Sequence, residues 1–277
     1  MTIKEVMAES IITIHKEQNI IDALKLMKKY KISRLPAIST KENKDELVGI
    51  LTEKDMATKI ASSKYENLPI SHFRISTLMT PDIITADVND AKIKVLKKMV
   101  DNKIGGIPIM DDNKIVGIVT KTDFMKKCTI EPYTTTPISE IMTPKVLTIE
   151  SEDRFVHARR IMIDNEVSRL IIVDTGKIEG IISARDMAKA VIEFKKRVPE
   201  KYQESQIRNM YIKDVMSKNV ESVTSDMTIA DVAKIMVDNE FSGMPIVDDG
   251  KMKGIVTKTD ILKFITDVMN RRENIEL

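Results

Sequence analysis

Four aspartates recur in one short pattern, and their carboxylates could hold the two hydroxyls of a ribose. Each stands at the end of a Gly-apolar-apolar-hydroxyl-x-x-Asp segment: Asp55, Asp123, Asp186 and Asp260. An ionised carboxylate accepts hydrogen bonds on both oxygens, so it can bind a sugar diol. The pattern is also that of a capping box, in which a hydroxyl and an acid three residues later cap a helix reciprocally. The hydroxyl residues are Thr52, Thr120, Ser183 and Thr257. The two roles are compatible, and Asp where a capping box prefers Glu favours the ribose role.

The first and third copies of this pattern carry basic residues that the other two lack. These residues are Arg34, Lys54, Arg169 and Arg185. The second and fourth copies have small or neutral residues at the same places, namely Gly106, Thr122, Gly243 and Thr259. Because the forked guanidinium matches phosphate oxygens, the basic residues are predicted to bind phosphate, and Thr122 and Thr259 to offer neutral contacts. The alternative explanation is that these residues lie on the surface and their charges vary between copies without a functional role.

These segments belong to a fourfold internal repeat, which must position them. Each repeat opens on an apolar residue and a methionine: Met7, Met79, Met142 and Met216. A proline or isoleucine follows each methionine at a constant distance of 29 residues: Pro36, Pro108, Ile171 and Pro245. The extra residues of the first copy fall in the polar stretch 41–45. Such registration predicts four copies of one structural unit.

The hydrophobic pattern predicts an α/β unit of order β-α-β-β-α in each copy. The opening strands are expected at Ile11–Ile14, Ile83–Thr85, Val146–Ile149 and Val220–Val223. Ile229, Val232, Ala233 and Met236 fall on one face of a helix, and Ile20, Ala23, Leu24 and Met27 repeat that face in the first copy. Two apolar runs joined by a turn follow, such as 107–110 and 115–120. One unit has too small a hydrophobic core to be stable alone, so the copies are expected to pair.

Linker composition predicts which copies pair. The stretch Thr129–Pro137, with two prolines and three consecutive threonines, is the clearest break and divides the chain into residues 1–130 and 131–277. The first half contains repeats at about 3–62 and 75–128, the second at about 138–193 and 212–270. The stretch Ala190–Tyr211, with the charge run at 195–197, is expected to be a solvated connector.

Composition excludes several classes of protein. The 277 residues carry a net charge of +2, which argues against binding of nucleic acid through an overall positive charge. Only 4% of the residues are aromatic, which argues against aromatic surfaces on which nucleobases stack. The single cysteine, Cys128, excludes a disulfide scaffold, and no apolar run approaches the ~18 residues of a membrane span. A cytoplasmic location is therefore expected. His15, His72 and His157 have no metal-ligand spacing, so no metal is expected to be required.

The combined motifs resemble the CBS domain. The resemblance rests on apolar-Met-Thr-Pro, on Ser-Arg-Leu-Pro or Gly-Gly-Ile-Pro, and on Gly-Ile-Val-Thr-Lys-Thr-Asp, and it covers nearly the whole chain. It implies two Bateman modules, each a pair of CBS repeats, similar to the γ subunit of AMP-activated protein kinase. It also implies binding of AMP, ADP or ATP between paired repeats, or sometimes of S-adenosylmethionine. The loop before the second strand would hold adenine through Ile32, Ser33, Ile104, Gly105, Val167, Ser168, Phe241 and Ser242. Beside the four aspartates, the nucleotide would also contact the hydroxyl residues Thr52, Thr120, Thr122, Ser183, Thr257 and Thr259.

The resulting prediction is a nucleotide sensor that regulates an unidentified protein, with a homodimer possible. The paired Arg and Lys argue against S-adenosylmethionine, which has no phosphate. An enzyme is disfavoured because no general base or metal cluster accompanies the sites, and the length leaves no room for a catalytic domain. A scaffold for protein or DNA contacts is the remaining alternative. The glycines of the repeat and the opening methionines are expected to have structural roles. The adenine loops have the alternative of being ordinary helix-to-strand connections. Arg159 lies on the buried face of a helix, where its guanidinium either extends to solvent or contacts an anion.

Overall fold

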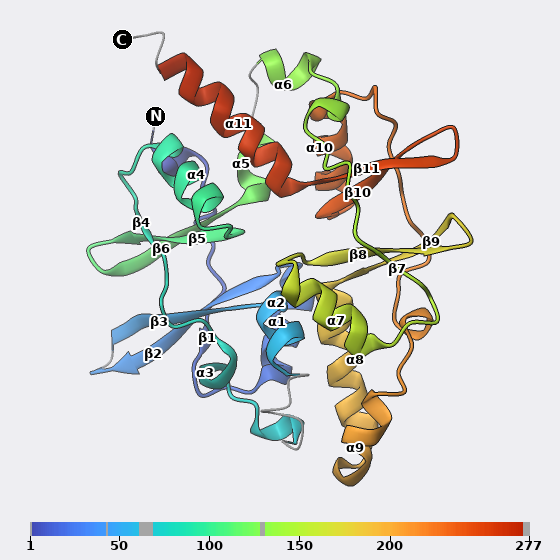
Figure 1. Cartoon of the computed structure of the whole chain (residues 1–277). Helices are drawn as coiled ribbons and strands as arrows, with labels where there is room; N and C mark the ends of the chain where they lie inside the picture. Colours follow the sequence, from blue (N-terminus) through green and yellow to red (C-terminus); the bar gives the residue numbers. More distant parts are fainter. Residues whose placement is uncertain (1, 43, 61–68, 128–130, 274–277) are drawn as a thin grey trace. The chain divides into compact units, whose positions relative to one another are not determined.

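A computed structural model describes residues 2–42, 44–60, 69–127 and 131–273 of the chain. It contains four copies of an α/β unit, as predicted, and Figure 1 shows their helices and strands. The first copy consists of a 3₁₀ helix (Ile3–Glu5), β1 (Ile14–His15), α1 (Ile20–Tyr30), β2 (Arg34–Lys41), β3 (Lys44–Thr52) and α2 (Glu53–Lys59). The second consists of a 3₁₀ helix (Ile70–His72), α3 (Ile75–Leu78), β4 (Ala86–Asp87), α4 (Lys92–Asp101), β5 (Gly106–Asp111), β6 (Lys114–Thr120) and α5 (Lys121–Lys127).

The second half of the chain repeats this order. After α6 (Glu131–Thr135), the third copy consists of a 3₁₀ helix (Ile138–Glu140), β7 (Thr148–Ile149), α7 (Phe155–Asp164), β8 (Arg169–Asp174), β9 (Lys177–Ser183) and α8 (Ala184–Arg197). After α9 (Glu200–Ile207), the fourth consists of a 3₁₀ helix (Ile212–Asp214), α10 (Ile229–Asp238), β10 (Gly243–Asp248), β11 (Lys251–Thr257) and α11 (Lys258–Glu273).

The helix faces are confirmed and the opening strands are shorter than predicted. All four predicted residues of α10 are buried, whereas on α1 Leu24 is only partly buried beside the buried Ile20, Ala23 and Met27. In the second copy the strand begins at Ala86, after the predicted stretch Ile83–Thr85. In the fourth copy only Val223 forms a bridge, to Ile246. In the first, third and fourth copies only the end of the predicted run reaches the parallel partner strand, and in the second the pairing begins just after it.

The described chain divides into two compact units, each with its own core. Unit 1 comprises Met1–Ile11, Ile84–Val146 and Glu221–Leu277, and unit 2 comprises Ile12–Ile83 and Leu147–Val220. Unit 1 therefore holds the bodies of the second and fourth repeats, and unit 2 those of the first and third. Two three-stranded sheets, β1-β2-β3 and β7-β8-β9, lie in unit 2. The pairing of neighbouring repeats into modules divided near residue 130 stays a prediction.

Each repeat gives its opening segment to the sheet of its neighbour in sequence. Ala8, at the start of the first repeat, forms an antiparallel bridge with Ile118 of the second, and Thr80 of the second bridges to Ile50 of the first. The second half contains the same exchange, between Thr143 and Ile255 and between Ser217 and Ile181. The exchange gives each small sheet an additional backbone partner and buries apolar residues such as Ile3 (0% exposed) in a core larger than one repeat could form.

The opening methionines pack on the repeat glycines, which explains why both recur. A Cβ atom added to Gly117 would lie 2.6 Å from the sulfur of Met7, and one added to Gly254 would lie 2.9 Å from the carbonyl oxygen of Thr143. Met79 covers Gly49 and Met216 covers Gly180 in the same way. The glycines are therefore required by close approach of a neighbouring segment, and the structural expectation for both residue types is confirmed.

Both predicted linkers are more ordered and more buried than expected. Glu131–Thr135 form helix α6, and Tyr133 is buried in the core of unit 1; residues 128–130 lie outside the described residues. Lys195 is only 6% exposed, donates to Gln203 Oε1 at 3.1 Å and lies over the ring of Phe73. The prediction of a solvated charge run is wrong for Lys195, because α8 continues to Arg197 and turns Lys195 onto its buried face, whereas Lys196 and Arg197 are exposed.

Candidate functional site

Each of the four aspartates caps its helix with one carboxylate oxygen. Oδ2 of Asp123 accepts from the backbone N–H of Thr120 at 2.7 Å and from its hydroxyl at 2.6 Å. Asp55, Asp186 and Asp260 make the same two bonds with Thr52, Ser183 and Thr257. The returning bond from the backbone N–H of the aspartate to the hydroxyl is present at Thr52 and Ser183, so the complete capping box is confirmed in the first and third repeats. Within the described residues, Oδ1 of Asp123, Asp186 and Asp260 accepts no hydrogen bond, so capping leaves one acceptor of each for a ligand.

The predicted adenine loops lie beside these aspartates in all four repeats. In each, a loop carbonyl accepts from the first residue of the helix that carries the aspartate: Ser33 from Glu53 (3.1 Å), Gly105 from Lys121 (3.3 Å), Ser168 from Ala184 (2.9 Å) and Ser242 from Lys258 (3.2 Å). The apolar loop residues Ile32, Ile104, Val167 and Phe241 are half-buried. Every repeat therefore places an apolar side chain and a carboxylate at one helix start, where the N-terminal end of the helix also favours anions.

The four predicted phosphate-binding residues all lie in unit 2. Helices α2 and α8 pack together there, and Nε of Arg185 on α8 lies 2.7 Å from Oε1 of Glu53 on α2. Lys54 donates to the carbonyl of Glu166 at 3.4 Å. Arg34 and Arg169 begin equivalent strands, and each donates to the serine hydroxyl before it. The alternation seen in the sequence thus concentrates four cations in one unit.

Glu53 is the acidic member of this cluster, and its position was not singled out from the sequence. Only 16% of its side chain is exposed. Burial raises the pKa of Glu53 above its ordinary value, while the charges of Arg185 and Arg34 oppose that shift. The carboxylate therefore occupies, beside Arg185, the kind of position that a phosphate oxygen would take.

Unit 1 has a reciprocal arrangement of lysine and threonine that sequence reasoning missed. Lys121 on α5 donates to the hydroxyl of Thr259 at 2.5 Å, and Lys258 on α11 donates to the hydroxyl of Thr122 at 2.9 Å. The two lysines stand two residues before Asp123 and Asp260, where the odd repeats have Glu53 and Ala184. Their recurrence in the even repeats was the available signal. Thr122 and Thr259 are thus joined to ammonium groups and are not merely neutral substitutes for the basic residues.

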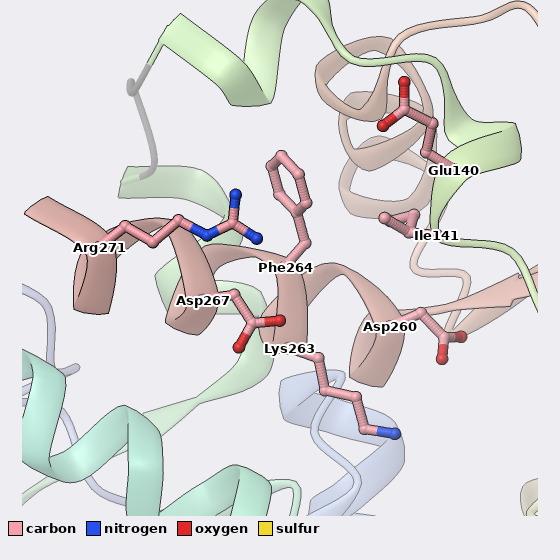
Figure 2. Close-up of a pocket in the computed structure, with 7 residues that line it drawn as sticks. All are labelled: Glu140, Ile141, Asp260, Lys263, Phe264, Asp267 and Arg271. Carbon is pink, nitrogen blue, oxygen red and sulfur yellow. The ribbon is translucent and has the colours of Figure 1, made fainter.

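A cavity of about 450 Å³ opens beside Asp260 in unit 1. Its lining residues come from α11 and from the segment that opens the third repeat: Glu140, Ile141, Asp260, Lys263, Phe264, Asp267 and Arg271. Figure 2 shows Lys263, Asp267 and Arg271 projecting from α11, with Glu140 and Ile141 on a separate segment. The lining combines a candidate ribose-binding carboxylate, an aromatic ring, two cations and two further acidic side chains.

Arg159 binds the end of a helix within unit 2. Its Nη2 donates to the carbonyl of Thr58 in the last turn of α2, at 2.5 Å, while its buried Nε has no hydrogen-bond partner among the residues that the structure describes. Burial lowers the pKa of this guanidinium. A cation is favourable near the C-terminal end of a helix. Arg159 therefore joins the third repeat to the first, and within the described residues it neither reaches an acidic side chain nor forms an ion pair.

Neither a metal cluster nor a membrane-spanning helix is found among the described residues. No three His, Cys, Asp or Glu side chains gather there in a way that could hold a metal ion. No helix there combines the length and the apolar character needed to cross a bilayer.

Comparisons with known proteins identify the repeat. The CBS domain family matches residues 3–62, 75–129, 138–193 and 212–267. Protein MJ1225 of Methanocaldococcus jannaschii is 26% identical over 200 residues, which cover 68% of this chain and 69% of that protein. Its crystal structure, described as that of a proposed archaeal homologue of the γ subunit of AMP-activated protein kinase, has a TM-score of 0.83 at 24% identity and covers 96% of this chain and 100% of that one.

A eukaryotic relative is similar over part of its length. The 5'-AMP-activated protein kinase subunit gamma of Dictyostelium discoideum is 26% identical over 200 residues, which are 64% of this chain and 34% of that protein. The present chain thus matches about a third of the Dictyostelium subunit.

Proposed function

This chain belongs to the CBS domain family, and on that premise we propose that it reversibly binds adenine nucleotides and so regulates a partner protein. CBS domains are ligand-binding regulatory modules. One observation carries the choice of ligand: each repeat places an aspartate at a helix start, next to an apolar loop, and in three repeats the second carboxylate oxygen accepts no hydrogen bond from the described residues. Such a carboxylate can accept from both hydroxyls of a ribose, and the loop can hold the base.

The cations near these carboxylates support nucleotides over uncharged adenosyl ligands. Arg34, Arg169 and Arg185 gather in unit 2, and Lys121 and Lys258 in unit 1. Phosphate oxygens pair with such groups by charge-assisted hydrogen bonds, which are roughly twice as strong as neutral ones. S-adenosylmethionine is a cation at its sulfonium and would be repelled by them. The proposed ligands are therefore AMP, ADP and ATP, with no catalysis and no resident metal.

Adenine nucleotides are expected to raise the melting temperature of the protein, whereas free adenine and inorganic phosphate should do so only weakly. At one hundred times Kd, a ligand that binds only the native state stabilises it by about 2.7 kcal/mol, which corresponds to a shift of roughly 5–10 °C. The measurement is thermal unfolding with each ligand at millimolar concentration. Asp260→Asn keeps a capping acceptor but loses the charge that holds a diol, so its unliganded melting temperature should stay near that of the wild type while its response shrinks.

Three outcomes would contradict this proposal. An equal shift with phosphate alone would mean a simple anion site, and a larger shift with S-adenosylmethionine than with any nucleotide would assign the sites to that ligand. The absence of any shift would favour the scaffold alternative.

A further inference from the structure

The four aspartate sites differ at the position one helical turn after the aspartate. This position holds Lys59, Lys127, Ala190 and Phe264 in the four repeats. A residue four positions after the aspartate lies on the same face of the helix, so it can reach the space that a ligand of the carboxylate would enter. The size and charge of this side chain therefore influence whether a ligand can reach the carboxylate in each repeat.

In the first repeat, Lys59 reaches across its aspartate to the neighbouring segment. Its ammonium group donates to the carbonyl of Leu78 at 2.7 Å and to that of Met79 at 3.1 Å, and it lies 3.7 Å from Oδ1 of Asp55. The hydroxyl of Thr80 also donates to Oδ1 of Asp55, at 3.3 Å. Since Oδ2 is occupied by the helix cap, both oxygens of Asp55 have partners from the protein.

The fourth repeat has the same architecture without this contact. Phe264 takes the place of Lys59, and the cavity of about 450 Å³ beside Asp260 is bounded by Ile141. Ile141 is the residue before the opening methionine of its repeat, as Leu78 is in the second repeat. Leu78, whose carbonyl Lys59 binds beside Asp55, is thus equivalent to Ile141, which bounds the cavity beside Asp260 (Figure 2).

We propose that Lys59 closes the Asp55 site to ribose, so that the chain binds nucleotide at its other repeats and not at the first. The inference rests on the proposed function. A diol at Asp55 would have to replace the hydroxyl of Thr80 and separate a carboxylate from an ammonium group. The side chain of Lys59 is only about one-third exposed, and its ammonium group donates to two carbonyls. Displacing such charge-assisted contacts removes most of the gain from the new hydrogen bonds.

The test counts nucleotide sites by equilibrium dialysis with saturating radiolabelled AMP. Lys59→Met keeps most of the aliphatic length and removes the ammonium group, so it is expected to bind one more equivalent of AMP than the wild type. Lys127→Met is the matched control, because Lys127 stands at the same position of the second repeat and is exposed. It should leave the number of sites unchanged.

A second pair of variants leaves Lys59 in place, so its result does not depend on whether replacing Lys59 impairs folding. Asp55→Asn should bind as many equivalents of AMP as the wild type, whereas Asp260→Asn should bind one fewer. An unchanged number for Lys59→Met, or a loss in Asp55→Asn, would overturn the closure by Lys59 while leaving nucleotide binding intact. A wild type that takes up no AMP, ADP or ATP would refute the proposed function together with this inference.

Discussion

Replacing Arg34 or Arg169 by alanine is expected to weaken ATP binding by about ten- to one-hundred-fold and to leave adenosine binding nearly unchanged. A hydrogen bond to a charged group contributes about 1.5–3 kcal/mol, and each 1.4 kcal/mol is a factor of ten in affinity. Both arginines lie in unit 2 together with the site of the third repeat, and only the phosphates of a nucleotide bound there can meet the guanidinium groups. The loss should therefore grow from adenosine through AMP to ATP. Calorimetric titration of each variant with the three ligands measures this gradient.

Arg160→Ala supplies the matched control for this prediction. Arg160 lies in the same unit on α7, with 80% of its side chain exposed and a single partner, Asp164, within its own helix. Its removal changes the net charge by the same amount but should not alter the ranking of the ligands. A uniform loss across adenosine, AMP and ATP in Arg34→Ala and Arg169→Ala would assign these arginines to the fold and remove the functional meaning of their alternation.

Neutralising Glu53 is expected to have the opposite effect, with ATP bound about tenfold more tightly by Glu53→Gln. The carboxylate pairs with Arg185 and would repel phosphates brought near the cluster. At an effective dielectric constant of about 20, one unit charge at roughly 10 Å contributes about 1.7 kcal/mol. The glutamine keeps the shape of the side chain, so the gain should be largest for ATP, smaller for AMP and absent for adenosine.

The same titrations distinguish this effect from a change in folding. Removing one partner of a half-buried ion pair destabilises the native state, so the melting temperature of unliganded Glu53→Gln is measured alongside. Stronger binding of ATP despite a lower melting temperature would support competition between Glu53 and phosphate for Arg185. Weaker binding of all three ligands would instead mean that Glu53 holds Arg185 in the position that binding requires.

Local features of the sequence predicted the repeat and the parts of each site that lie within one repeat. The motif ending in Asp123 contains both the capping threonine and the acid, and their contact follows from a spacing of three residues in a helix. The helix face from Ile229 to Met236 is likewise a property of one segment. Such features depend on neighbours in the chain, so their pattern is visible without knowing the tertiary structure.

Contacts between repeats were beyond this kind of reasoning. The sequence showed that Arg34 and Arg169 alternate with glycines, yet nothing local indicated that the first and third repeats share a core. For the same reason Lys121 was not linked to Thr259, 138 residues away. Lys195 was assigned to solvent because its neighbours are charged, whereas its burial depends on where α8 ends.

Native mass spectrometry of the freshly purified protein tests the central claim most directly, because it identifies whatever small molecules the chain retains. Added masses equal to those of AMP, ADP or ATP are expected, and they should exchange for one another when a different nucleotide is supplied. Fewer should remain on Asp260→Asn than on the wild type. A protein that carries no adenine nucleotide, and that takes up none of the three at millimolar concentration, would contradict the assignment of these sites to nucleotides.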